Sequence, residues 1–305
     1  MSLEVFNNIK SILDTKNFSN KGKNIYIDNK KNNFKKNFEF QWNKFPLTQL
    51  DSHTGLPLSK ERFTKSSDWQ LANLKDKIVI EIGSGAGRFT EILSNAGSYV
   101  ISIEISDAIF VNYKNNKSDK IIFIKSSLYD LQFLNGLFDY VLCYGVAQHT
   151  PNIFKTYQAC YDFCKIGGKI SIDHYLKTYL PSPKYLWRPV TKRINPKTLF
   201  KIIKFYIPYY FPIDTFLKTK LPDKIGKIIR RCIPIPCWNY TGEKNVPQEH
   251  TKLLTWSILD TFDGLSAEYD TPLRPSELEQ IVEKIGVNSF TIKEGGTGIV
   301  LNIDK

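Results

Sequence analysis

The chain has 305 residues, of which 42% are hydrophobic and 24% are charged, and this composition excludes disordered, collagen-like and disulfide-scaffold proteins. Its 42 Lys and Arg residues exceed its 30 Asp and Glu residues by twelve, so we expect an anionic partner such as phosphate, lipid headgroups or nucleic acid. The five cysteines are an odd number without paired CxxC spacing, which favours a reducing compartment and no metal site.

The first forty residues are rich in Lys and Asn. They predict a short helix and then a tail that is partly mobile within residues 1–37. Charges interrupt the apolar positions of residues 1–18, so we expect no signal-peptide core. No stretch reaches the roughly 20 apolar residues of a membrane-spanning helix. We therefore expect a cytoplasmic protein, in which spaced aromatic and leucine residues from Phe38 to Trp69 complete an N-terminal cover over residues 1–69.

From Lys77 onward, short β-branched runs alternate with helical stretches, which indicates a parallel sheet with covering helices. The strands are expected at residues 78–82, 99–104, 121–124, 140–144 and 169–174, and the helices near residues 87–96, 108–115 and 153–164. After residue 175 this alternation stops for about a hundred residues.

The last part of the chain predicts a helix over residues 276–285, with Ser276 as its N-cap and Glu279 as the capping-box partner. Strands at residues 289–294 and 298–303 are joined by the turn Gly295-Gly296, which is typical of a hairpin. Together these patterns predict a doubly wound α/β domain with a seven-stranded, mostly parallel, Rossmann-like sheet. We assign this domain to residues 70–174 and 273–305.

The intervening residues 175–272 predict an inserted α-helical cap. Residues 175–245 hold fifteen Lys and Arg but three Asp and Glu, so their surplus of twelve equals that of the whole chain. Lys197, Lys201 and Lys204 share a helical face opposite Leu199 and Ile203, and Lys224, Lys227 and Arg231 repeat this spacing opposite Ile225 and Ile229. Basic amphipathic helices of this kind lie on anionic membranes, so residues 197–231 predict peripheral contact with the inner face of a membrane. A cap with a solvated basic face is the alternative.

The most informative local pattern is the run from Val79 to Phe89, in which an apolar strand passes through Gly83, Gly85 and Gly87 into a helix. Glycines let the backbone approach a ligand, and the following helix start offers free N–H groups. Glu81 would repel a pyrophosphate but suits a cationic ligand. Glu104, at the end of the next strand, stands where an acid can accept both hydroxyls of a ribose.

Together with Phe138–Tyr144 and the turn Lys165–Gly168, these motifs resemble the class I S-adenosylmethionine-dependent methyltransferases. The resemblance implies S-adenosylmethionine as cofactor, with Glu81 and the glycine backbone at its amino-acid end and Glu104 at its ribose. Ser127 stands where many members place an adenine-binding Asp, so Leu128 would offer a backbone N–H instead. The residues expected at the cofactor are Glu81, Gly83, Ser84, Gly85, Gly87, Glu104, Ile105, Ser127, Leu128 and Tyr144.

Two further stretches resemble a narrower group of bacterial methyltransferases often placed in surface-polysaccharide or related envelope gene sets. They are Gln41–Phe45 with Thr48–Asp51, and Leu259–Asp263 with Tyr269–Asp270 and Gly296–Val300. That resemblance implies an acceptor among envelope saccharides or related metabolites, without naming it.

Methyl transfer from a sulfonium needs mainly alignment and exclusion of water, and a hydroxyl acceptor also needs a base. His149 directly follows the fourth strand, while Asp173 and His174 end the fifth, and strand alternation lets one of these last two face the pocket. These three residues are the catalytic candidates. We expect methyl transfer to a small or lipid-linked acceptor, at a hydroxyl of a sugar or related metabolite. The alternatives are a nucleic-acid (RNA) methyltransferase, which we consider less favoured, and a binding protein that retains the fold without catalysis; the sequence indicates no oligomeric state.

Overall fold

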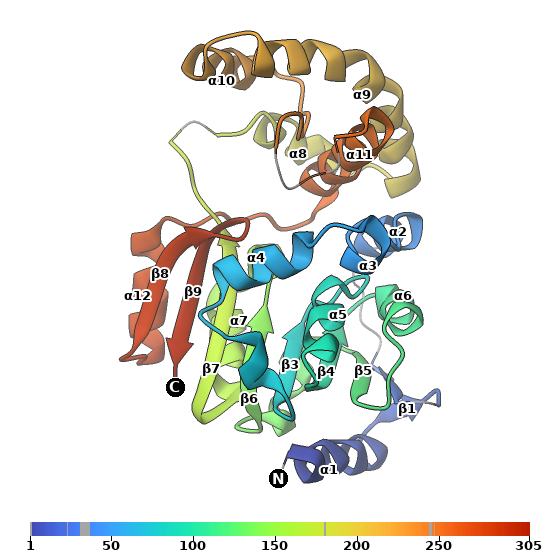
Figure 1. Cartoon of the computed structure of the whole chain (residues 1–305), viewed down its shortest axis with the longest axis vertical. Helices are drawn as coiled ribbons and strands as arrows, with labels where there is room; N and C mark the ends of the chain where they lie inside the picture. The colour runs from blue at the N-terminus through green and yellow to red at the C-terminus, as the bar shows by residue number, and fades with distance from the viewer. Residues whose placement is uncertain (1, 23, 31–36, 180, 244–245, 247) are drawn as a thin grey trace.

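The computed structural model describes residues 2–22, 24–30, 37–179, 181–243, 246 and 248–305. Its centre is a nine-stranded sheet in the order β1-β2-β5-β4-β3-β6-β7-β9-β8, with helices on both faces and a helical cap at one end (Figure 1). The strands are β1 (Phe18–Asn20), β2 (Ile25–Asp28), β3 (Ile78–Ile82), β4 (Tyr99–Glu104), β5 (Ile121–Lys125), β6 (Phe138–Cys143), β7 (Cys164–Tyr175), β8 (Phe290–Gly295) and β9 (Gly298–Asp304).

The helices precede, cover or cap this sheet. They are α1 (Ser2–Thr15), α2 (Asn37–Lys44), α3 (Asp51–Thr54), α4 (Leu58–Ser66), α5 (Arg88–Asn95), α6 (Ala108–Asn115), α7 (Ile153–Phe163), α8 (Lys184–Thr191), α9 (Pro196–Thr219), α10 (Asp223–Cys232), α11 (His250–Ser266) and α12 (Pro275–Ile285). Four short 3-10 helices, η1 (Leu71–Leu74), η2 (Leu128–Asp130), η3 (Gln132–Leu134) and η4 (Ala147–His149), complete the connections. The predicted doubly wound α/β fold is thus confirmed, and all seven predicted strands are present.

The expected strand count of seven is wrong, because β1 and β2 extend the sheet at its edge. β2 pairs in parallel with β5, placing Ile25 opposite Phe123, and β1 pairs antiparallel with β2. The Asn24 side chain fixes this register by donating to the carbonyl of Ile121 at 3.0 Å. This segment was expected to belong to a mobile tail, since strands of three and four residues among Lys and Asn give no alternation signal. Residues 31–36 of that tail lie outside the described residues.

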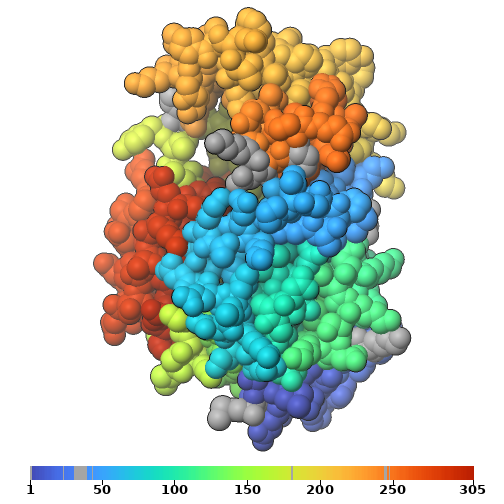
Figure 2. Space-filling view, in the orientation of Figure 1, coloured from blue at the N-terminus to red at the C-terminus, as the bar shows by residue number. Residues whose placement is uncertain are grey.

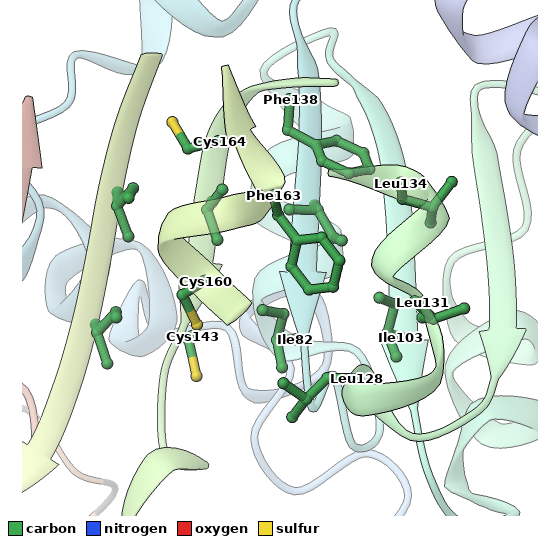
Figure 3. Close-up of a cluster of buried hydrophobic side chains, with 14 of the residues drawn as sticks. Ile82, Ile103, Leu128, Leu131, Leu134, Phe138, Cys143, Cys160, Phe163 and Cys164 are labelled. Carbon is green, nitrogen blue, oxygen red and sulfur yellow. The ribbon is translucent and has the colours of Figure 1, made fainter. Parts of the chain in front are cut away.

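The core lies in two layers, one on each face of the sheet. Side chains from α1, α7 and α12 cover one face, and side chains from α4, α5 and α6 cover the other. Figure 3 shows part of the first layer, where Cys143 and Cys160 meet beside Phe163. These free thiols are fully buried, so they serve as small apolar groups of the core.

The N-cap of α12 lies two residues before the predicted N-cap, Ser276. Arg274 is the N-cap and Pro275 occupies the first turn, where its missing N–H is not needed. The carboxylate of Glu277 accepts the Arg274 backbone N–H at 2.7 Å. Ser276 and Glu279 therefore do not form the expected capping box, because the proline starts the helix earlier.

The cap is residues 176–273, which contain α8 to α11. Its two ends lie side by side, because Leu176 forms a bridge with Leu273 and the Leu273 N–H donates to the carbonyl of Tyr175 at 2.9 Å. The apolar faces of α9 and α11 form its core, including Leu199 and Ile203. Within the ranges given above, no helix combines the length and apolar character that would let it cross a bilayer.

The helix α10 packs differently from α9. Ile225 and Ile229 are exposed, and the inward side instead presents Gly226, where an added Cβ would lie 2.4 Å from the carbonyl oxygen of Leu217. On the same side, Arg230 donates through two nitrogens to the Asp214 carboxylate, each at 2.8 Å. Backbone approach and an ion pair therefore hold α10, rather than its isoleucines.

Candidate functional site

A cavity of about 1900 Å³ lies between the carboxyl edge of the sheet and the cap. Its floor includes Gly83, Gly85 and Glu104, and its roof includes Trp238 and Asp260 of the cap. Figure 2 shows the surface hollowed beneath α10, between the cap and the lower part of the chain. The glycine turn and the cap therefore face one shared space, at the edge where ligands bind in open α/β sheets.

The glycine turn connects the buried strand β3 to α5. Gly83, Ser84 and Gly85 line the cavity, and the indole of Trp42 lies over the turn, since a Cβ on Gly85 would meet it at 3.1 Å. Gly87 does not line the cavity; a Cβ there would lie 2.0 Å from Oδ1 of Asn112. Gly87 thus allows α5 to pack against α6, while the other two glycines open the backbone toward a ligand.

Glu104 ends β4, is buried, and lines the cavity floor. Its Oε2 accepts the Gly85 N–H at 3.1 Å, and its Oε1 accepts the backbone N–H and the hydroxyl of Ser106 at 2.9 and 2.8 Å. Three donors therefore orient this carboxylate beside the glycine turn.

Glu81 is buried behind the turn and does not line the cavity. Its Oε2 accepts a hydrogen bond from the Thr90 hydroxyl, which in turn accepts from the Asn112 amide at 2.8 Å. Burial raises the pKa of Glu81 to about 8. Its Oε1 has no hydrogen-bond partner within the described residues, and neither has the buried Oγ of Ser84. Of these two atoms only the Ser84 hydroxyl belongs to a residue that lines the cavity, where it suits a ligand that brings hydrogen-bond donors.

The residues that follow β4 and β5 form another part of the cavity wall. Ile105, Ser127 and Leu128 line it as expected, although the Ser127 hydroxyl accepts the Tyr129 N–H at 3.3 Å and so caps η2. Sequence reasoning missed Asp28 of β2, which also lines the cavity and accepts the Ser126 hydroxyl at 2.9 Å. No local sequence pattern could have placed Asp28 there, because Asp28 and Ser126 are 98 residues apart along the chain.

His149, at the end of η4, lines the cavity. Its Nδ1 lies 2.8 Å from the carbonyl oxygen of Tyr269. A carbonyl can only accept, so Nδ1 carries the proton and Nε2 is the ring's acceptor atom. Burial lowers the pKa of His149 below its ordinary 6.5, so the ring is neutral at physiological pH and can take up a proton.

The other two catalytic candidates, Asp173 and His174, are buried and do not line the cavity. Asp173 forms an ion pair with Arg62 of α4 and accepts the Gly145 N–H. His174 is held between the Thr271 carbonyl at 2.7 Å and the Tyr157 hydroxyl at 3.2 Å, and burial lowers its pKa to about 4. The geometry gives both residues structural partners and favours His149 as the base.

Tyr144 lines the cavity as expected, at the end of β6. Its hydroxyl is 2.6 Å from Oγ of Ser171, and its ring meets Phe89 edge to face at 5.3 Å. The ring is therefore fixed in place before any ligand arrives.

The cap brings two carboxylates of α11 to the cavity, Asp260 and Asp263. Burial raises the pKa of Asp260 to about 7 and that of Asp263 to about 6. Asp260 accepts the Tyr240 hydroxyl, while Oδ1 of Asp263 has no hydrogen-bond partner among the residues described. Both lie in the run Leu259–Asp263, which carried a signal in the sequence but no assigned role.

Two arginines line the cavity from the cover and the sheet side, Arg62 and Arg88. Arg88 donates to Oγ of Ser59 at 3.1 Å and to Oε1 of Gln49 at 3.0 Å. Burial and the nearby Arg62 lower the pKa of Arg88 to about 9. The cavity therefore offers both cationic and anionic groups, and the sequence analysis had singled out neither arginine.

Comparison with known proteins identifies a methyltransferase domain within this fold. Residues 80–172 match the family model described as a methyltransferase domain. The ubiquinone biosynthesis O-methyltransferase of Coxiella burnetii is 27% identical over 117 residues, which cover 36% of this chain and 50% of the relative. The enzyme of the same name from Aromatoleum aromaticum is 28% identical over 122 residues, covering 37% and 52%. The chain thus spans about half the length of the curated relatives it matches.

Among solved structures, a protein of Methanococcus maripaludis described as a putative S-adenosylmethionine-dependent methyltransferase superposes with a TM-score of 0.48 at 16% identity, covering 90% of this chain and 96% of that one. The matched residues 80–172 contain the glycine turn, Glu104 and the strands β4 to β6. This chain contains a class I S-adenosylmethionine-dependent methyltransferase domain, and the cofactor of that domain is S-adenosylmethionine.

Proposed function

We propose that this chain transfers a methyl group from S-adenosylmethionine to a hydroxyl of a small or lipid-linked acceptor, a sugar or related envelope metabolite. The observation that carries the proposal is the single cavity onto which the glycine turn, Glu104, His149 and the carboxylates of the cap all open. A donor and an acceptor bound there share one space between the sheet and the cap, which favours their alignment.

The residues on the cavity floor fit the cofactor. Glu104 would accept the ribose hydroxyls, and the backbone of Gly83 to Gly85 would meet the amino-acid end. The unpartnered Oγ of Ser84, which lines the cavity, supports this placement, because the ammonium of the cofactor brings donors. We assign the adenine end to Leu128 and to Asp28, whose carboxylate lies beside Ser126. The cofactor supplies a methyl group that its sulfonium has already activated.

His149 is the proposed base. Its Nδ1–H is engaged by the Tyr269 carbonyl, which fixes the ring so that Nε2 would take up the proton of the acceptor hydroxyl. The lowered pKa of the ring supports this role, because the imidazole is neutral and ready to accept.

The cap supports an acceptor rich in hydroxyls. Trp238, Tyr240 and Trp256 offer aromatic surfaces beside the carboxylates of Asp260 and Asp263. Carboxylates accept hydrogen bonds from hydroxyl groups, and aromatic faces pack against the apolar face of a sugar ring. The curated relatives are named as O-methyltransferases, which supports oxygen as the acceptor atom.

The outer end of the cavity supports an acceptor that also carries negative charge. Lys227 and Arg231 of α10 line it there, and phosphate groups of a lipid-linked sugar would meet both cations.

Two measurements test this function. Calorimetric titration with S-adenosylmethionine should give micromolar binding, and titration with nicotinamide dinucleotide should give none. The protein, labelled cofactor and separated fractions of sugars, envelope lipids and RNA should then yield label in a saccharide or lipid-linked saccharide. Label in RNA would overturn the proposed acceptor, and failure to bind S-adenosylmethionine would leave a fold without this chemistry.

A further inference from the structure

The outer side of α9 carries a continuous apolar stripe. Its members are Ile202, Phe205, Tyr209, Ile213 and Phe216, with exposed fractions between 47% and 72%. They recur at intervals of three or four residues, so they share one side of the helix. The opposite side holds the buried residues that pack on α11. The core of the cap accounts for the buried apolar side of α9 but not for the exposed one.

The neighbouring helix α10 extends this surface. Ile225, Ile228 and Ile229 are exposed, because Gly226 and Arg230 occupy its inward side. Figure 1 shows α9 and α10 together at the end of the molecule farthest from both termini. We name these eight apolar residues of α9 and α10 the outer stripe. Apolar patches of this size mark interaction sites.

Exposed cations accompany the outer stripe. Lys201 and Lys204 directly precede Ile202 and Phe205 on α9, Lys224 and Lys227 directly precede Ile225 and Ile228 on α10, and all four lysines are exposed. This pattern of apolar groups beside Lys and Arg is that of helices lying in the interface of an anionic bilayer. A second copy of the chain would bring the same surplus of twelve positive charges over residues 175–245, which opposes self-association through this face.

We propose that the outer stripe docks the cap on an anionic lipid bilayer. The aromatic and isoleucine side chains enter the headgroup boundary, and the flanking lysines pair with anionic headgroups. This docking stands on its own observations. One consequence rests on the proposed function: Lys227 and Arg231, which flank the exposed Ile228, also line the cavity, so a lipid-linked acceptor enters the cavity from the membrane side.

The test is co-sedimentation of the full chain with vesicles of phosphatidylglycerol and phosphatidylcholine in equal parts, and with vesicles of phosphatidylcholine alone. The wild type should bind the anionic vesicles. The triple variant Phe205→Ser, Tyr209→Ser, Phe216→Ser should bind them at least about tenfold more weakly. Lys201→Glu with Lys224→Glu changes the charge by four units and should weaken binding to the anionic vesicles by about 10²- to 10³-fold.

The matched control is Leu3→Ser with Ile166→Ser, which removes two exposed apolar side chains far from the cap and should leave binding unchanged. Calorimetry with S-adenosylmethionine checks that each variant is folded. Three results would overturn the docking: no binding by the wild type, full binding by the triple variant, or a lipid-free dimer that the triple variant dissociates. The vesicles contain neither cofactor nor acceptor, so failure here leaves the proposed methyl transfer standing, and failure of methyl transfer leaves the docking standing.

Discussion

Replacing Glu104 should remove most of the affinity for S-adenosylmethionine. Its carboxylate is held by the Gly85 N–H and by both donors of Ser106, so it is oriented before the ribose arrives and little ordering entropy is lost on binding. A hydrogen bond to a charged group contributes about 1.5–3 kcal/mol. Two ribose hydroxyls therefore account for about 3–6 kcal/mol, and Glu104→Ala should weaken binding by about 100- to 10,000-fold.

The isosteric variant Glu104→Gln sharpens the test. Its amide oxygen would face the two donors of Ser106, so its NH₂ group would face the Gly85 N–H, where two donors meet. A donor left without an acceptor at a buried site costs about 1–3 kcal/mol of folding stability. The NH₂ group also cannot accept a ribose hydroxyl, so this variant should bind the cofactor weakly although its shape is preserved. A matched control is Glu283→Gln on the exposed side of α12, which should leave affinity unchanged.

The assay is calorimetric titration with S-adenosylmethionine, with thermal unfolding to show that each variant is folded. If folded Glu104→Ala binds the cofactor within about threefold of the wild type, which is less than 1 kcal/mol, the ribose does not lie at Glu104 and the placement of the cofactor is wrong.

Three further residues give distinct outcomes. His149→Gln should lower kcat by about 10²- to 10⁴-fold with cofactor affinity unchanged. Because burial lowers the pKa of this histidine below 6.5, the wild-type kcat should fall on acidification with its midpoint below pH 6.5. A normal kcat in the variant removes His149 as the base. Glu81 has a folded-state pKa of about 8 against an ordinary 4.5, so the cofactor-free protein should lose stability as the pH rises from 4.5 to 8, by a few kcal/mol at about 1.4 per pH unit; Glu81→Gln should flatten this profile in urea unfolding, and an identical slope in both proteins refutes the assignment. Asp28→Asn should weaken S-adenosylmethionine binding about tenfold, measured against Asp130→Asn, and equal affinities would show that Asp28 does not reach the adenine.

The central sheet could be predicted because its signals are local. The strands β3 and β4 match their predicted bounds, since each is a run of buried β-branched residues that ends at a glycine or an acid. The edge strand β2 could not be predicted, because only its pairing with β5 makes Ile25 a strand residue. The same pairing brings Asp28 to the cavity. Because the sequence did not predict β2, it also did not predict Asp28 as a site residue.

The sequence predicted which residues lie at the carboxyl edge of the sheet better than it predicted which of their side chains face the cavity. Gly83, Gly85, Glu104 and His149 line the cavity because each follows the carboxyl end of a parallel strand. His174 occupies an equivalent position in the sequence but turns toward Tyr157 and Thr271. Its orientation depends on α7 and on the chain that returns from the cap, and these are contacts that no local pattern contains.

The cover helix α2 links the cap to the cofactor turn. Phe40 packs against Phe200 of α9 at 5.4 Å and against Phe262 of α11 at 5.5 Å between ring centroids. Two residues further on, Trp42 lies over Gly85. The helix α2 therefore connects the apolar core of the cap to the cover over the glycine turn. Excluding water from a sulfonium methyl requires such cover, so a change in the packing of the cap reaches the cofactor turn through α2.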